Sequence, residues 1–369
     1  MLTKALRRTA LYDEHRALGG RLVPFAGFEM PVQYAGILKE HEAVRKRAGV
    51  FDLSHMAQFE LRGPGVAAWA DALTVNEVAT MKPWQARYNI FTNERGGCLD
   101  DVLFYRLDGD AWLLVVNASN AEKMWTYLSV KRMPGVTLEN RHGERALIAV
   151  QGPRALEIVE RLIVEGERED LRAMRYYTCR QSRVAGVPAL LARTGYTGED
   201  GFELFIEGAD APRVWLRLLE VGSAYDAAPA GLGARDILRL EAGMPLYGFE
   251  LTEELSPIAG GQSWAVKMGK PEFVGKRALA EQIAGGTYDR IVGMLLPGKV
   301  PARTGYAVFL GEERVGEVRS ASFAPSVGAN IATALVRKDA APEGTELSVE
   351  IRGARHAAKV LKLPFYRRS

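Results

Sequence analysis

Two adjacent carboxylates, Asp100 and Asp101, stand in the run 96–104, which otherwise has the apolar character of a buried strand. Burying a lone ionised carboxylate costs several kcal/mol even after the protein relaxes around it. We therefore expect one of these two carboxylates to have a role in binding or catalysis. Because successive side chains of a strand point to opposite faces, the two acids cannot share one role.

We expect Asp101 to be the acid that does chemistry, because alternation places it on the more apolar face of the strand. The other residues of this face are Leu99, Leu103, Tyr105 and Leu107. A carboxylate there is the better candidate for a raised pKa and for contact with a cationic or proton-donating ligand atom. Asp100 is nearer the Gly-Gly turn and could instead cap backbone N–H groups. The alternative is that both acids are turn residues ending a hairpin arm.

A third carboxylate, Glu203, follows a segment with the glycine spacing G-x-x-G-x-x-G and precedes the apolar run 204–206. This spacing matches neither the dinucleotide fingerprint nor the P-loop. A glutamate at the mouth of a buried strand can accept two parallel N–H donors from a planar ligand such as a pterin or guanine. Arg235, at the start of a predicted helix, could orient Glu203 or bind a ring carbonyl. The alternatives are a tight β-turn for the glycine segment and a solvated surface position for Arg235.

Composition restricts the class of protein. A chain of 369 residues exceeds what one core usually holds, so we expect two or three domains. A net charge of +3, with basic and acidic residues interspersed, does not indicate a nucleic-acid partner. Cys98 and Cys179 form no CxxC pair, and the five histidines show no metal-ligand spacing. The sequence lacks a signal-peptide core and an apolar run of about 18 residues, which predicts a cytoplasmic protein with no membrane contact. A processed organellar protein would have the same features.

The pattern of apolar residues mixes helices and strands without regular alternation, which favours an α+β protein. After residue 290, short apolar runs alternate with Gly and Pro turns, as in a small antiparallel barrel or sandwich. We expect a hairpin over 99–117, a strand or hairpin over 184–194 and extended chain over 50–56. The predicted helices cover 36–48, ended by Gly49, and then 153–164, 208–223 and 234–243.

Six motifs together resemble the T-protein family, the aminomethyltransferases of the glycine cleavage system. They are FAGFEMPVQY (25–34), FDLSHM (51–56), FTNERGGCLDD (91–101), IAVQGP (148–153), RTGYTGEDGFEL (193–204) and GLGARDILRLEAGMPLYG (231–248). The resemblance runs in order through nearly the whole chain. It implies a three-domain cloverleaf around a central folate cavity, with two α+β domains containing antiparallel sheets and a C-terminal β-barrel. The implied domains are residues 1–50 with about 140–245, residues 51–139 with about 246–285, and residues 286–369.

The resemblance also implies roles for individual residues. Asp101 matches the catalytic aspartate of the family, and Glu203 and Arg235 match its pterin-binding residues. Tyr366 lies near a C-terminal tyrosine implicated in substrate binding. The positions that line the folate cavity are matched by Met56, Tyr88, Asn117, Tyr196 and Trp264. The chain departs from the family at YGFEL (247–251), where YGND is more usual, and at Ala259, where a glutamate is common.

By this resemblance, the substrates are tetrahydrofolate and the aminomethyl group carried by the lipoylated H-protein, with no metal or flavin. Two groups of relatives are excluded. The dehydrogenases of dimethylglycine and sarcosine carry a flavin domain, and this chain has no GxGxxG unit for a flavin. The iron-sulfur-assembly relatives carry a cysteine motif, and this chain has no cysteine in the corresponding segment 270–276. The alternatives are a non-enzymatic folate-binding module and a folate-dependent demethylase of another small methylated substrate. Six basic residues are candidates for docking an acidic carrier, or for a solvated face of the barrel: Arg352, Arg355, Lys359, Lys362, Arg367 and Arg368.

Overall fold

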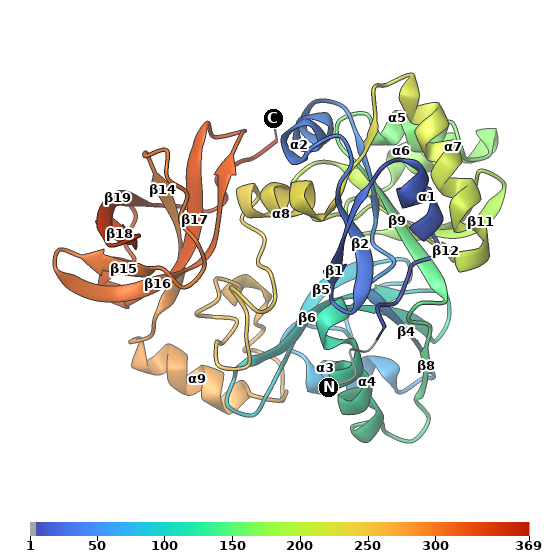
Figure 1. Ribbon diagram of the computed structural model, residues 1–369. Helices are drawn as coiled ribbons and strands as arrows, with labels where there is room; N and C mark the ends of the chain where they lie inside the picture. The colour runs from blue at the N-terminus through green and yellow to red at the C-terminus, as the bar shows by residue number, and fades with distance from the viewer. Residues whose placement is uncertain (1–4, 369) are drawn as a thin grey trace. The chain divides into compact units, whose positions relative to one another are not determined.

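The computed structural model describes residues 5–368 (Figure 1). Its chain forms two compact units, which we call the first and second unit. The first unit consists of Met1–Trp69, Thr80–Arg87 and Val102–Asp236, and the second of Ala70–Ala79, Tyr88–Asp101 and Ile237–Ser369. The expected α+β class is confirmed. The three-domain division stays a prediction.

A six-stranded sheet forms the core of the first unit, in the order β10-β11-β12-β9-β3-β13. Neighbouring strands are antiparallel except β13 and β3. Its strands are β3 (Gly49–Asp52), β9 (Arg145–Gln151), β10 (Cys179–Val184), β11 (Val187–Ala192), β12 (Gly201–Glu207) and β13 (Ala228–Pro229). A buried cluster joins β9 and β12 to the helices through side chains such as Phe202, Ile158 and Trp215.

Five helices accompany the six-stranded sheet, and α5 lies beside α6 and α7 (Figure 1). They are α1 (Tyr12–Ala17), α2 (Ile37–Lys46), α5 (Ala155–Glu160), α6 (Arg168–Ala173) and α7 (Ala211–Ser223). A two-stranded hairpin, β1 (Arg21–Phe25) with β2 (Phe28–Gln33), precedes α2. Buried Glu40 of α2 accepts hydrogen bonds from the backbone N–H of Tyr34, Gly36 and Gly231, so it joins the turn before α2 to the residue that precedes α8 (Leu232–Glu241).

A second sheet has five strands in the order β5-β6-β7-β4-β8. The strands are β4 (Ala57–Arg62), β5 (Ala86–Thr92), β6 (Cys98–Arg106), β7 (Ala111–Val116) and β8 (Thr137–Asn140). The helices α3 (Val66–Leu73) and α4 (Ala121–Val130) follow β4 and β7 in the sequence. The pairing of Leu103 with Val115 and of Arg106 with Trp112 confirms the hairpin expected over 99–117.

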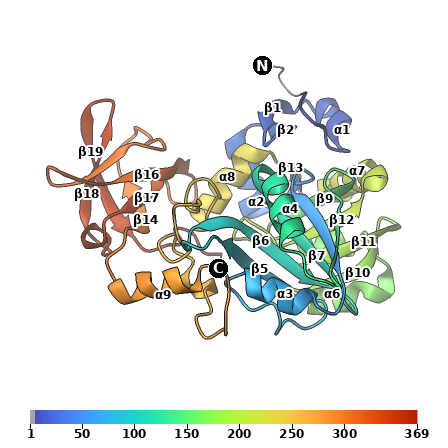
Figure 2. The same cartoon turned by 90° about the horizontal axis from the view of Figure 1, so that it is seen from below.

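The C-terminal part of the second unit is a closed six-stranded barrel in the order β14-β17-β16-β15-β18-β19, seen in orange to red in Figure 2. Closure removes the exposed strand edges that an open sheet would have. The strands are β14 (Arg290–Leu296), β15 (Ala307–Leu310), β16 (Glu313–Ala324), β17 (Ala329–Val336), β18 (Glu346–Ile351) and β19 (Ala354–Leu361). Helix α9 (Lys276–Gly285) precedes it, and α8 (Leu232–Glu241) runs from the first unit into the second. The predicted barrel is confirmed.

The expected helices are present, but several of their boundaries are wrong. Helix α2 ends at Lys46, and Gly49 is the first residue of β3 instead of a helix terminator. Gly49 is required there by packing, because a Cβ atom would lie 2.4 Å from Cγ2 of Val44. Helix α5 covers Ala155–Glu160, well within the predicted 153–164. Among residues 5–368, no helix is long and apolar enough to span a membrane.

Candidate functional site

The strand separates the two adjacent acids as expected, with Asp101 on the face that also carries Leu99, Leu103 and Tyr105. Asp100 is fully buried, while Asp101 is half-buried. Asp100, Val102 and Phe104 are all buried on one face, whereas on the face of Asp101 the leucines are partly buried and Tyr105 is fully buried. Counting apolar residues did not predict which of the two acids is the more buried, because Leu99 and Leu103 are only partly covered. Both acids lie inside β6, so they are not turn residues.

Asp101 lies next to an aromatic pair. The Tyr88 hydroxyl donates a hydrogen bond of 3.1 Å to Oδ2 of Asp101. The Tyr88 ring stacks on Trp264, with centroids 5.5 Å apart and planes at 25°. Trp264 is 58% exposed, and its Nε1 donates to Oε1 of Gln262 at 2.9 Å. The structure therefore brings three sequence-predicted residues together as a carboxylate beside an accessible aromatic platform.

Glu203 is the buried carboxylate of the first unit. It occupies the third position of β12 and accepts hydrogen bonds from the hydroxyls of Thr194 and, at 3.3 Å, Tyr105. Burial raises the pKa of Glu203, against the opposing effects of the Thr194 hydroxyl, the Arg235 charge and the Tyr105 hydroxyl. Sequence reasoning missed both hydroxyl partners. The position of Thr194 at the start of the glycine segment was the available signal.

Arg235 contacts Tyr196, another residue to which the resemblance gives a role in the folate site. Its guanidinium lies 4.6 Å from the centroid of the Tyr196 ring, a cation–π contact. The loop that carries Tyr196 is held by Gln151, whose Nε2 donates to the Thr194 carbonyl and whose Oε1 accepts from Thr197. A Cβ atom at Gly195 would lie 2.0 Å from Gln151 Oε1, so a larger residue here would displace the amide that holds the loop. Arg235, Tyr196 and Glu203 thus belong to one part of the first unit.

Of the remaining predicted residues, Met56 precedes Ala57 and Asn117 follows Val116, the paired end residues of β4 and β7, so these two lie at the same end of the sheet, whereas Tyr366 belongs to the second unit. Met56 is half-buried in the turn after β3, where its N–H donates to the Leu53 carbonyl. Asn117 is half-buried at the end of β7. In the second unit, the N–H of Tyr366 donates to the Glu241 carbonyl of α8 at 2.8 Å. This bond fixes the C-terminal segment against α8.

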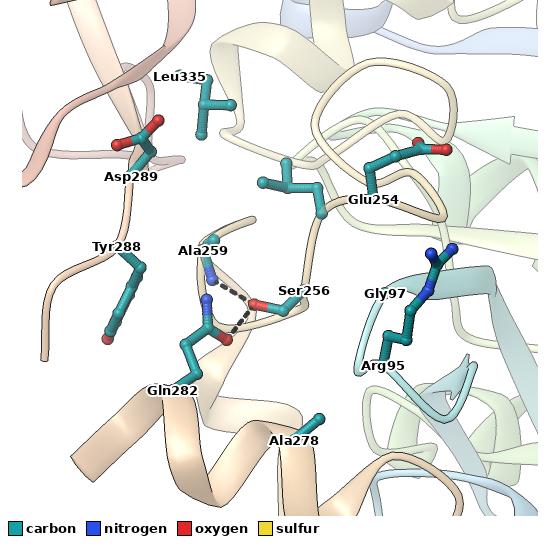
Figure 3. Close-up of a pocket in the computed structure, with 11 residues that line it drawn as sticks. Arg95, Gly97, Glu254, Ser256, Ala259, Ala278, Gln282, Tyr288, Asp289 and Leu335 are labelled. Atoms are coloured by element: carbon teal, nitrogen blue, oxygen red, sulfur yellow. Dashed lines mark hydrogen bonds between the residues drawn. The ribbon is translucent and has the colours of Figure 1, made fainter. Parts of the chain in front are cut away.

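The second unit also contains a cavity of about 320 Å³ beside α9 (Figure 3). Ser256 donates to Gln282 and accepts from the N–H of Ala259, one of the positions that depart from the family. None of the site residues predicted from the sequence lines it. The lining residues are Arg95, Gly97, Glu254, Leu255, Ser256, Ala259, Ala278, Gln282, Tyr288, Asp289 and Leu335. Within the described chain there is no group of three or more His, Cys, Asp or Glu residues placed to hold a metal ion.

Known proteins are similar to this chain over nearly its whole length. The GCVT N-terminal domain model matches residues 11–270, and the glycine cleavage T-protein C-terminal barrel domain model matches residues 290–367. The chain is 48% identical to an aminomethyltransferase of Rubrobacter xylanophilus, covering 98% of this chain and 95% of the relative. It is 41% identical to an aminomethyltransferase of Desulforamulus reducens, covering 98% and 99%. The crystal structure of the glycine cleavage system aminomethyltransferase T from Bartonella henselae matches with a TM-score of 0.90 at 33% identity, over 98% of each chain.

Proposed function

The chain belongs to the glycine cleavage T-protein family and is a folate-dependent aminomethyltransferase of that system, and we propose how its residues perform the transfer. The observation that carries this function is the similarity to aminomethyltransferases along the full length of both chains. A folate-binding module without activity is not favoured, because the similarity is not confined to one binding segment. A demethylase of another small substrate is not favoured for the same reason.

The proposed reaction starts from an aminomethyl group bound through sulfur to the dihydrolipoyl arm of the H-protein. The carbon–sulfur and carbon–nitrogen bonds of this group break, and the carbon forms bonds to two nitrogens of tetrahydrofolate. The two protons lost by the folate nitrogens go to the thiolate and to the departing ammonia. The products are 5,10-methylene-tetrahydrofolate, ammonia and reduced H-protein.

We assign the catalytic role to Asp101. Cleavage of the donor builds iminium-like positive charge on the carbon and nitrogen, which a fixed carboxylate stabilises better than water does. The Tyr88 hydroxyl, 3.1 Å from Oδ2, orients this carboxylate. Tyr88 and the exposed Trp264 ring offer a surface for a planar or apolar group of either substrate. In the proposed site, Met56, Asn117 and Tyr366 also contact the substrates.

Glu203 and Arg235 are proposed to hold the pterin. An ionised Glu203 would accept two parallel N–H donors from the ring edge, which fixes the folate for attack. We expect Glu203→Gln to weaken tetrahydrofolate binding by about 1 to 3 kcal/mol, because the amide replaces an acceptor with a donor. Calorimetric titration measures this change. An unchanged affinity would leave Glu203 with only a structural role.

The raised pKa of Glu203 predicts a pH dependence of folate binding. Two N–H donors favour the ionised carboxylate, so binding must remove a proton wherever free Glu203 is protonated. Affinity is therefore expected to fall as the pH drops through the pKa of Glu203 and to be flat above it. Titrations across this range should show the Glu203-dependent part of the slope disappear in Glu203→Gln. An identical slope in both proteins would contradict an ionised Glu203 in the complex.

The H-protein is the proposed partner, and the six basic C-terminal residues named above are proposed to steer it. All six are exposed in the structure. We expect the KM for intact H-protein to rise with salt, since salt screens steering between exposed charges, while the KM for free aminomethyl-dihydrolipoamide stays nearly flat. Equal salt dependence for the two substrates would leave shape as the basis of recognition. A reducing compartment such as the cytoplasm fits the free, buried thiols of Cys98 and Cys179.

A further inference from the structure

The turn before Met56 is fixed by a buried polar network. Oδ1 of Asp52 accepts from the N–H and the hydroxyl of Ser54, and Oδ2 accepts from the Thr9 hydroxyl at 2.7 Å. His15 bridges Oδ2 of Asp52 and the Tyr34 hydroxyl, with a distance of 2.9 Å to each. These contacts fix the backbone of the turn that leads through His55 and Met56 into β4.

His55, directly before Met56, has a buried ring nitrogen without a hydrogen-bond partner among the described residues. The side chain is 2% exposed, and Nδ1 has no hydrogen-bond partner among the described residues. Burial, together with the charge of Arg235, lowers the pKa of His55 to about 3. The ring is therefore neutral near pH 7 and offers one donor and one acceptor. Its edge packs against Phe25, with centroids 5.4 Å apart.

Gln58, two residues after Met56, is buried, and both polar atoms of its amide lack hydrogen-bond partners among the described residues. It is 1% exposed, and neither Oε1 nor Nε2 has a hydrogen-bond partner in the described chain. An unsatisfied buried polar group costs about 1 to 3 kcal/mol, so each one in a native protein calls for an explanation such as a functional role or a water molecule. Two such atoms on one side chain form an adjacent acceptor and donor.

The register of the five-stranded sheet shows where this amide points. Gln58 pairs with Val115, and Val115 pairs with Leu103, so the three side chains share one face of the sheet. Tyr105, on the same face, donates to Glu203 of β12. Glu60, also on this face, binds Arg145 of β9 at 2.6 Å. Gln58 therefore points into the layer between the two sheets, on the side where Glu203 lies.

We propose that His55 and Gln58, on either side of Met56, form a second polar subsite that hydrogen-bonds the part of the bound folate not held by Glu203. The inference rests on the proposed function. A neutral ring nitrogen and a neutral amide suit a neutral donor–acceptor group, such as a ring lactam or an aryl amide, and not a carboxylate or an ammonium. The cost of leaving these atoms unpaired in the free protein is recovered when the ligand pairs them.

The test uses Gln58→Met, which keeps the length of the side chain and removes its polar atoms. Because the free protein loses two unsatisfied atoms, we expect its thermal midpoint to be unchanged or higher. Tetrahydrofolate affinity, measured by calorimetry, is expected to fall about tenfold. His55→Phe, which keeps the ring packing on Phe25, is expected to weaken binding in the same direction. Gln181→Met makes the same change at an exposed glutamine and should match the unchanged chain in both measurements.

Comparison with Glu203→Gln separates the two claims. If the unchanged chain does not bind tetrahydrofolate, or Glu203→Gln binds it equally well, the proposed pterin site itself is wrong. If Glu203→Gln binds weakly but Gln58→Met and His55→Phe bind as the unchanged chain does, the second subsite is wrong and water satisfies these atoms. A lower thermal midpoint of Gln58→Met with unchanged affinity would give Gln58 a structural role and would also overturn the inference.

Discussion

Asp101→Asn is expected to lower kcat by about a hundredfold or more while tetrahydrofolate affinity stays close to that of the unchanged chain. The substitution keeps the size of the side chain and an oxygen that can accept from Tyr88, so it removes little except the charge. Loss of one fixed electrostatic partner of a transition state has an effect of this order. Single-turnover formation of methylene-tetrahydrofolate measures the chemical step separately from product release.

Asp100→Asn is the matched control, because it makes the same change at the next residue of the same strand. Asp100 is fully buried on the opposite face, so its loss should affect the free energy of unfolding more than the rate of the folded enzyme. We expect its kcat, corrected for the folded fraction, to fall much less than that of Asp101→Asn. Equal losses in the two variants would contradict the assignment of Asp101.

Glu250→Ala is expected to lower the free energy of unfolding by about 3 to 5 kcal/mol, because it leaves the guanidinium of Arg239 buried without its carboxylate. Nη1 of Arg239 lies 3.2 Å from Oε2 of Glu250, and both side chains are 2% exposed. Glu250 also accepts from the N–H of Leu246 at 2.9 Å and from the Thr333 hydroxyl in the barrel. Denaturant unfolding followed by circular dichroism measures the change.

Two further variants make this prediction specific to the buried pair. The double variant Arg239→Met with Glu250→Met replaces both charges by apolar groups and is expected to be more stable than Glu250→Ala. Glu313→Ala breaks an exposed pair with Arg337 and should leave the unfolding midpoint unchanged. A small effect of Glu250→Ala, similar to that of Glu313→Ala, would show that Arg239 finds another partner or water.

The elements of the fold could be predicted because their signals are local. The hairpin of β6 and β7 follows from two apolar runs around Asp108 and Gly109, and the barrel follows from short strands between Gly and Pro turns. The boundaries of α2 and α5 could not be predicted from the sequence, because they depend on how distant segments pack against these helices. Gly49 shows this, since its tight contact with Val44 is visible only after β3 is placed beside α2.

The site was only partly predictable for a similar reason. Alternation separated Asp100 from Asp101 correctly, but which face is buried depends on what packs on each side of the sheet. The buried carboxylate Glu203 could be selected from the sequence, whereas its partner Tyr105 lies 98 residues away in the chain. The unused atoms of Gln58 have no sequence signal, because only the folded structure shows which hydrogen bonds are absent.

The central claim, folate-dependent transfer from a carrier protein, is tested most directly by following ammonia released from aminomethylated H-protein with and without tetrahydrofolate. We expect fast release with tetrahydrofolate, one methylene-tetrahydrofolate formed per ammonia, and release slower by about a hundredfold or more without it. Release at the same rate without tetrahydrofolate, or ammonia without methylene-tetrahydrofolate, would contradict the account.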